Sequence, residues 1–179
     1  AYIIDKKIYC VTEPKLINYK KPLANVDGVL NAINIETDQL KSLYLEGEGA
    51  GGKATASSVL SDLYEIVTIS NKLSLGYSVD NLNKFKKFNY LETESSFYLR
   101  IMTKDTAGVL SKITGHFEDF NISIEKILQI PDDDNRLSVP IIIFTHLIKK
   151  NIILKAINLI EKQDFVLERV SIISIYKSS

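Results

Sequence analysis

The sequence predicts an α+β protein in two parts: a partial β-sheet with one helix, followed by a module whose elements run in the order βαββαβ. Three observations predict this fold class. Strand-like alternation covers Ala1–Leu45, a glycine-dense turn then leads into one helical stripe, and alternating and helical patterns follow each other from Phe97 onwards. From these changes of pattern we expect two domains, residues 1–76 and residues 95–179, joined by a polar linker over residues 77–94.

The composition argues against several classes of function. The 179 residues carry 22 basic and 22 acidic side chains, and this balance disfavours a nucleic-acid-binding surface, which needs an excess of Lys and Arg. No apolar run approaches the roughly 18 residues of a membrane span. Cys10 is the single cysteine, and His116 and His146 have no thiol or acidic cluster beside them. We therefore expect a cytoplasmic protein without a disulfide within the chain and without a metal site.

Short strands separated by turns are predicted for the first part. Alternation from Ile8 to Thr12 and from Val29 to Ile35 is typical of a sheet that is covered on one face. Prolines and the Asp27-Gly28 pair mark the turns between these strands. The chain begins at Ala1 and not at Met, and it enters strand-like sequence at once, so we expect it to be a fragment of a longer protein.

The stretch Leu45–Ser58 carries four of the eight glycines and connects a short strand, Ser42–Glu46, to a helix predicted from Ala54 to about Asn71. Apolar residues three or four positions apart predict the helix: Val59, Leu63, Ile66 and Val67. A glycine-dense turn of this kind can bring backbone N–H groups against an anionic ligand at the positive end of the helix dipole. A tight turn that needs positive φ also explains the glycines, so the residues alone leave both interpretations open.

Two phosphate-binding motifs are incomplete in this stretch. Gly47 and Gly52-Lys53 fit the start of a nucleoside-triphosphate loop, but Ala54 stands where the motif requires Ser or Thr to hold magnesium. The dinucleotide fingerprint G-x-G-x-x-G is matched only in part by Gly47, Gly49 and Gly52, and no acidic residue ends a strand about twenty residues on. The stretch therefore satisfies neither motif.

From Phe97 the predicted elements alternate regularly. Four strands are predicted, at Phe97–Met102, Asn121–Gln129, Leu137–His146 and Phe165–Tyr176, with a turn at Asp132–Asn135. Two amphipathic helices are predicted, one opened by Asp105–Gly108 and the other at Lys149–Lys162. This order suits a four-stranded antiparallel sheet backed by two helices, the ferredoxin-like arrangement, which many unrelated functions share.

The glycine stretch carries a family resemblance. Gly47–Leu63, GEGAGGKATASSVLSDL, resembles the homoserine dehydrogenase motif G-x-G-A-G-x-x-P-T-A-S-x-V-x-x-D-L, with Ala54 in place of the usual Pro. Upstream, Lys21–Ile33 resembles the H-P-L-A-x-V-x-G-x-x-N-A-V run of the same family, in the family's order and at about its spacing. The resemblance implies that residues 1–76 end the catalytic and dimerisation region, and that the helix returns to a nucleotide-binding domain.

The second part resembles an ACT domain, the amino-acid-sensing module of biosynthetic enzymes. Leu99–Leu110, with its ending D-x-x-G-V-L, and Asn121–Glu125 carry this resemblance. Val139–His146 is similar to the V-P-I-V-I-V-T-H stretch in the ACT domain of homoserine dehydrogenase itself. Both parts of the chain thus point independently to one enzyme family.

The resemblance implies an enzyme that interconverts L-aspartate 4-semialdehyde and L-homoserine with NAD(P)H, on the route to threonine, methionine and isoleucine. It implies a cofactor contact at Gly51, with Gly49, Ala50 and Thr55 nearby. The family's dinucleotide-binding domain, catalytic lysine and acidic residues lie upstream of the matching segment. We therefore expect no catalytic residue here, no turnover by this chain alone and no tight cofactor binding.

The ACT resemblance also implies an effector site. ACT domains usually pair and bind a small amino acid at the shared edge, which implies a homodimer or homotetramer. The implied site is the strand-to-helix turn, whose N–H groups meet the ligand carboxylate, together with a partner segment that meets its ammonium group: Asp105, Gly108, Val109 and Leu110, then Asn121 and Ile122. Threonine is the expected effector. The turn also fits a plain helix cap, which needs no ligand.

Two other functions fit parts of the sequence. A free-standing regulatory protein that binds an amino acid is suggested by the ACT part and by the missing catalytic half. A regulatory piece of aspartate kinase is a further alternative, because that enzyme also carries ACT domains, but it has no equivalent of Gly47–Leu63.

Overall fold

The computed structural model describes residues 1–68, 78–129 and 138–176. The chain divides into two compact units, which are described separately below. One unit contains Ala1–Leu16 together with Phe85–Ser179, and the other contains Ile17–Lys84. The first sixteen residues thus pack with the C-terminal part of the chain, whereas the sequence patterns grouped them with residues 17–76.

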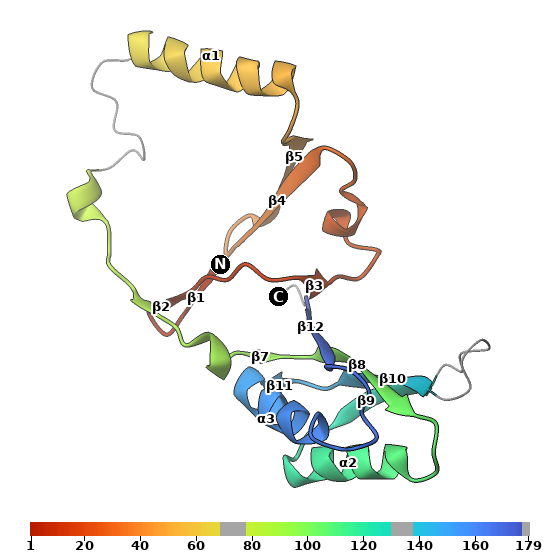
Figure 1. Ribbon diagram of the computed structural model, residues 1–179. Coiled ribbons are helices and arrows are strands. Elements are labelled where there is room, and N and C mark those ends of the chain that lie inside the picture. The colour runs from red at the N-terminus through yellow and green to blue at the C-terminus, as the bar shows by residue number, and fades with distance from the viewer. Residues whose placement is uncertain (69–77, 130–137, 177–179) are drawn as a thin grey trace. The chain divides into compact units, whose positions relative to one another are not determined.

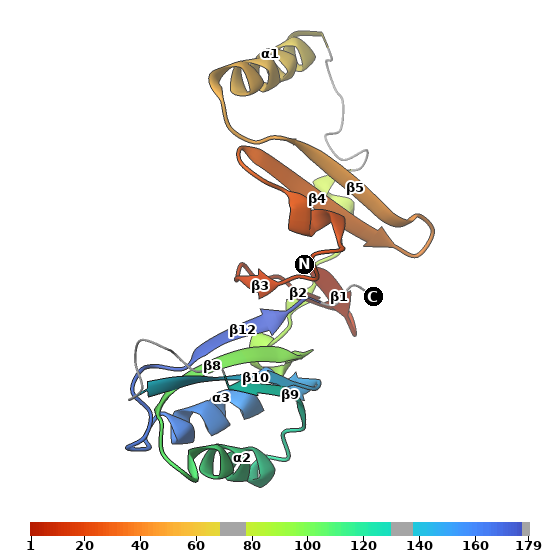
Figure 2. The ribbon, with the colours of Figure 1, turned by 90° about the vertical axis from the view of Figure 1, so that its right-hand side faces the viewer.

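The C-terminal module, residues 97–176, has the expected order of elements. Its strands and helices are β8 (Phe97–Lys104), α2 (Val109–Asp119), β9 (Ile124–Gln129), β10 (Ser138–Thr145), α3 (Lys150–Ile160) and β12 (Ser171–Ile175). The strands lie in the order β12-β8-β10-β9, and neighbours are antiparallel. Both helices cover the same face of the sheet (Figures 1 and 2). The predicted βαββαβ fold is therefore confirmed.

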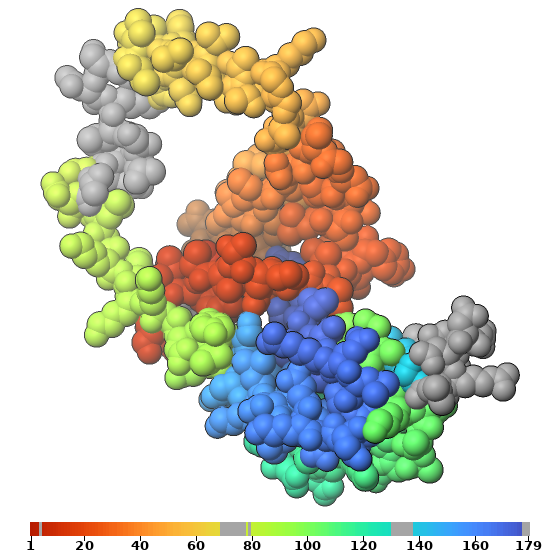
Figure 3. Space-filling view, viewed as in Figure 1, coloured from red at the N-terminus to blue at the C-terminus, as the bar shows by residue number. Residues whose placement is uncertain are grey.

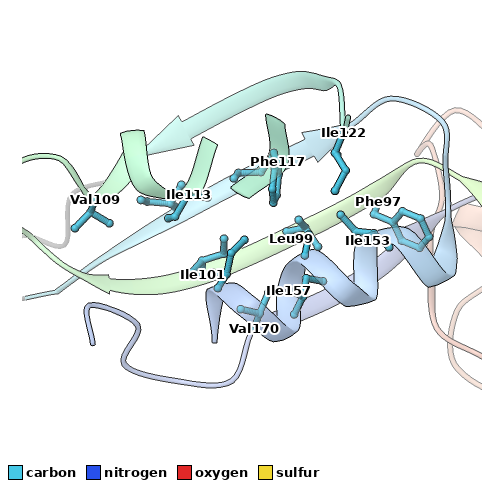
Figure 4. Packing of buried hydrophobic residues seen from close by; sticks show 14 of the residues in the cluster. Phe97, Leu99, Ile101, Val109, Ile113, Phe117, Ile122, Ile153, Ile157 and Val170 are labelled. Atoms are coloured by element: carbon cyan, nitrogen blue, oxygen red, sulfur yellow. The ribbon is translucent and has the colours of Figure 1, made fainter. Parts of the chain in front are cut away.

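The core of this module lies between the sheet and the two helices. On β8 every second residue is buried, so that Phe97, Leu99 and Ile101 point to the helices. Ile113 and Phe117 on α2 face them at a spacing of four, as one side of a helix requires. Figure 4 shows these side chains packed against one another. Figure 3 shows the outer surface of the module, coloured green to blue, as one closely packed body.

Residues 1–16 add strands to this unit. β1 (Tyr2–Ile4) and β2 (Lys7–Tyr9) form a hairpin whose turn residues, Asp5 and Lys6, both have positive φ. β6 (Lys86–Lys87) pairs with β2, and β3 (Lys15–Leu16) pairs with β12, both in parallel. The module's sheet therefore has β3 as a fifth strand, which the sequence patterns did not predict.

Short elements occupy the described part of the predicted linker. They are η2 (Val79–Asn81), β6, η3 (Tyr90–Glu92) and β7 (Glu94–Ser95). The side chain of Asn89 accepts a hydrogen bond from the amide of Leu91 at 3.1 Å and so caps the start of η3. β7 pairs with β11 (Ile148–Lys149), just before α3. Residues 85–94 are therefore attached to the unit that contains the module.

The unit Ile17–Lys84 contains η1 (Pro22–Asn25), a hairpin of β4 (Leu30–Thr37) and β5 (Lys41–Glu48), and α1 (Gly52–Thr68). The predicted strands and helix are therefore present. The helix begins slightly before the expected start at Ala54. The expected end of this helix near Asn71, and the expected turn at Asp132–Asn135, lie outside the described residues.

The apolar faces of this unit are uncovered. Alternation puts four apolar side chains on one face of the hairpin, and each is 41–60% exposed: Ile33, Ile35, Leu43 and Leu45. On α1 the predicted stripe is also exposed, from 51% at Val59 to 83% at Val67. Among the described residues of 17–84, none is buried. This unit thus presents two surfaces that a folded protein normally buries.

Candidate functional sites

The glycine-rich loop connects β5 to α1 and is open to solvent. Gly51 adopts a φ of 118°, which L side chains rarely adopt, and its carbonyl accepts the first helical bond, from the amide of Thr55 at 3.1 Å. Residues 48–53 are all exposed. Because the first N–H groups of a helix have no partner within it, the start of α1 offers bare donors and a partial positive charge.

The four residues predicted to contact a cofactor lie together in this loop. Gly49, Ala50 and Gly51 precede α1, and Thr55 lies in its first turn. Gly49 also has a role within the hairpin: its amide donates to the carbonyl of Val29 at 2.9 Å. A Cβ added at Gly49 would clash with the amide end of the exposed Asn31 side chain, which would have to move aside.

A pocket of about 240 Å³ opens at one end of the module's sheet, where β8 and β9 finish and α2 begins. It is lined by the end of β8, by the turn that follows, and by three residues of the neighbouring strands: Thr103–Leu110, Gln129, Val139 and Ile141. Its volume is below the roughly 300–1,000 Å³ of sites for drug-sized ligands. The pocket therefore suits a small ligand.

The turn at this pocket presents backbone donors. Gly108 is the N-cap of α2, with a φ of 87°, and no side chain caps the helix. Within the described residues, no carbonyl accepts the amides of Gly108 and Leu110. The Thr103 hydroxyl is already used, because it donates to the carbonyl of Val139 at 3.1 Å. An anion at this end of α2 would thus meet free amides and the helix dipole.

The predicted effector residues fall into two groups. Asp105, Gly108, Val109 and Leu110 line the pocket, whereas Asn121 and Ile122 lie at the opposite end of α2. Asn121 has a φ of 52°, and the buried Ile122 donates its amide to the carbonyl of Phe117 at 2.8 Å. Within their own chain these two residues end the helix and do not line the pocket.

Gln129 is a pocket residue that sequence reasoning missed. It ends the edge strand β9, and its pairing with Ile141 of β10 places it beside the pocket. The signal was a polar residue at the end of a predicted strand. Only the register between β9 and β10 brings it near the turn after β8.

The described part of the chain contains neither a metal-binding cluster nor a membrane-spanning helix. No group of three or more His, Cys, Asp or Glu side chains there is placed to hold a metal ion. Of the helices in that same part, none combines the length and the apolar character needed to span a bilayer.

Two family models match the chain. Residues 2–64 match homoserine dehydrogenase, and residues 97–165 match the ACT domain. The first match contains the glycine-rich loop, and the second contains all the residues that line the pocket.

Individual relatives agree with these matches. Homoserine dehydrogenase of Pseudomonas aeruginosa is 35% identical over 74% of this chain and 32% of its own length. That of Neisseria gonorrhoeae is 32% identical over 94% of this chain and 40% of its own length. The crystal structure of a homoserine dehydrogenase from Thiobacillus denitrificans superposes with a TM-score of 0.79 at 28% identity, covering 97% of this chain and 40% of that one.

The chain spans only 32–40% of the length of these relatives. It corresponds to their C-terminal region, with the ACT domain following the segment that contains the glycine-rich loop. Sequence and fold together place the chain in the homoserine dehydrogenase family.

Proposed function

We propose that this chain acts as the C-terminal part of a homoserine dehydrogenase. The assembled enzyme interconverts L-aspartate 4-semialdehyde and L-homoserine with NAD(P)H, in the cytoplasm, on the route to threonine, methionine and isoleucine. A dinucleotide-binding and catalytic part supplies the hydride-transfer site. The family membership and the extra length of the relatives support this proposal.

The observation that carries the proposal is the open glycine-rich loop at the start of an uncovered helix. Gly51 has a φ of 118° just before α1, and the residues around it are exposed. Bare amides at a helix start suit the phosphates or the carboxamide of a nicotinamide cofactor. The apolar stripe of α1, exposed at Val59 and Val67, suits a protein surface beside that cofactor. Gly49, Ala50 and Thr55 would line the same contact.

A chimera tests this role. The chain replaces the matching C-terminal 40% of the Thiobacillus denitrificans enzyme, and NADPH-dependent turnover is measured. We expect turnover from the chimera and none from the purified 179-residue chain. Gly51→Ala should raise the KM for NADPH, while Gly52→Ala, at a position with open space and without positive φ, should not. Turnover by the isolated chain contradicts the proposal.

The pocket is the proposed effector site, and threonine is the proposed effector. Amides of Gly108 and Leu110 would bind the carboxylate, and the Asp105 carboxylate would attract the ammonium group. A second copy of the chain would bring its Asn121 and Ile122 to the site, in a homodimer or homotetramer. Such binding regulates the enzyme only through a difference in affinity between two arrangements of the subunits.

Calorimetric titration tests the effector. Threonine, serine and methionine are titrated separately into the 179-residue chain, and its melting temperature is followed in parallel. We expect heat and a raised melting temperature with threonine. The absence of both with all three amino acids would leave the pocket a structural feature, while the dehydrogenase proposal would still rest on the chimera.

A further inference from the structure

A cluster of charged and polar side chains joins residues 13–15 to the C-terminal module. The Glu13 carboxylate lies 2.8 Å from Nζ of Lys15 and 2.6 Å from Nζ of Lys150, the first residue of α3. Its side chain is 17% exposed, and that of Lys150 is 18% exposed. The Ser174 hydroxyl donates to Oε1 of Glu13 at 3.1 Å and accepts from Nζ of Lys15 at 3.2 Å. These four residues are called the Glu13 cluster below.

The cluster extends to the segment that precedes β8. Lys150 places its ammonium group 5.2 Å from the ring centre of Tyr90, and its backbone amide donates to the carbonyl of Thr93 at 2.9 Å. Thr93 is itself buried. Lys150 thus contacts both the N-terminal segment and the segment after residue 85.

The first of these segments lies just before the chain leaves this unit, and the second lies shortly after the chain returns to it. The chain leaves after Leu16, the last residue of β3, and it returns at Phe85, just before β6. β3 pairs with β12, and the carbonyl of Leu16 accepts a hydrogen bond from the amide of Tyr176 at 2.8 Å. β6 pairs with β2, and the carbonyl of Ile8 accepts a hydrogen bond from the amide of Phe88 at 2.8 Å.

We propose that the Glu13 cluster is an anchor within this unit. It holds the first crossing, where β3 pairs with β12, and through Lys150 it also holds the segment that follows the second crossing, where β6 pairs with β2. Both attachments thus depend on one carboxylate.

The physical reason lies in the shortness of the strands. β3 and β6 have two residues each, and so few ladder hydrogen bonds do not hold a strand against fraying. A partly buried carboxylate between two ammonium groups supplies the missing attachment. Removing its charge would leave the ammonium groups of Lys15 and Lys150 close together without an anion. The loss of stability should therefore exceed that from losing one surface ion pair.

Amide hydrogen exchange measured by NMR on the 179-residue chain tests the anchor. The amide of Tyr176 reports the first crossing and that of Phe88 reports the second, because each donates across the relevant pairing. The amide of Ile122, bonded to Phe117, serves as a reference for the folded core. We expect Glu13→Gln to speed exchange at Tyr176 and Phe88 roughly tenfold and to leave Ile122 unchanged.

Two further variants sharpen the test. Glu168→Gln makes the same chemical change at an exposed position that forms no ion pair with a described residue, and it should alter none of the three amides. Lys150→Met should speed exchange at the same two amides, and the double variant should add little to either single change, because both remove one interaction. Unchanged exchange at Tyr176 or at Phe88 in Glu13→Gln overturns the proposal, because the cluster would then hold one crossing or neither.

Discussion

Glu13 has an environment that makes its charge matter for folding. Burial alone raises the pKa of a carboxyl group, but hydrogen bonds from Lys15 and Lys150, together with their charges, outweigh this effect and lower the pKa of Glu13 from 4.5 to about 2. Burial, and then the charge of Glu13, raises the pKa of the nearby Tyr2 and Tyr9. The carboxylate is thus ionised across the whole range in which most proteins stay folded.

The sign of the resulting pH dependence follows from linkage. Because the folded-state pKa of Glu13 is depressed, its contribution to the free energy of unfolding is complete above about pH 4.5. This contribution is lost as the pH falls towards 2. We expect Glu13→Gln to lower the free energy of unfolding by roughly 1–3 kcal/mol at pH 7, between the values for exposed and buried pairs. The difference from the wild type should shrink below pH 4.5.

Urea denaturation at a series of pH values from 7 down to 3 measures this difference. Subtracting the stability of the variant from that of the wild type at each pH isolates the contribution of Glu13. Glu168→Gln should show no difference from the wild type at any pH. A Glu13→Gln deficit that stays constant to pH 3 would mean that the side chain acts by packing and not by charge.

Gly108 and Gly115 form a matched pair on one helix. A Cβ at either position meets nothing within 4 Å, but only Gly108 has a positive φ, 87°. We expect Gly108→Ala to cost about 1 kcal/mol, because L residues are strained there. Gly115→Ala, inside α2, should stabilise by up to about 1 kcal/mol. Urea denaturation checks both values, and equal effects of the two changes would exclude backbone strain as the cause.

At the scale of elements, the sequence predicts well where a pattern repeats over several residues. β8 alternates over eight residues and buries its face under two helices, so local pattern and tertiary packing agree. β3 has two residues, which is too few for a pattern, and its partner β12 lies far away in sequence. The bond from Ser174 to Glu13 spans 161 residues. The sequence around either residue does not predict such a pairing.

The same contrast applies to the pocket. The turn from Asp105 to Leu110 was predictable, because a glycine between a strand and a helix marks a cap with free amides. The resemblance implies that Asn121 contacts the ligand. Within this chain Asn121 has a positive φ just after the end of α2, where it helps to terminate the helix. The position of Gln129 beside the pocket depends on the register between β9 and β10. This register cannot be read from the sequence of one strand.

The apolar stripe of α1 allows a test of whether the helix is uncovered. Val67 is 83% exposed, so Val67→Lys should change the free energy of unfolding by no more than about 0.5 kcal/mol. It should reduce the binding of a hydrophobic dye and the association of the chain at high concentration. Ser61→Lys, on the same helix, should change neither property. A large loss of stability in Val67→Lys would show that the helix packs against its own chain.

At the scale of the whole molecule, the two units differ in how they are stabilised. The module has a continuous core that includes Leu99, Ile113 and Ile153, each fully buried. The unit Ile17–Lys84 has a hairpin and a helix without a buried residue among those described. An isolated hairpin or helix is marginal in water, because its backbone entropy is not offset by apolar burial. Residues 17–84 are therefore expected to be much less stable than the module.

This difference predicts two classes of hydrogen exchange in the 179-residue chain. Amides of β4, β5 and α1 should exchange roughly a hundredfold or more faster than those of α2 and α3, because local opening there exposes almost no further apolar surface. Mass spectrometry of exchanged peptides measures both classes, with the unfolded chain as the reference. In the chimera with the Thiobacillus denitrificans enzyme, the same peptides should become protected as the missing surface covers Ile33, Leu45 and Val67. Equal protection of both units in the isolated chain would mean that residues 17–84 complete their own core, and the need for a catalytic partner would lose its physical basis.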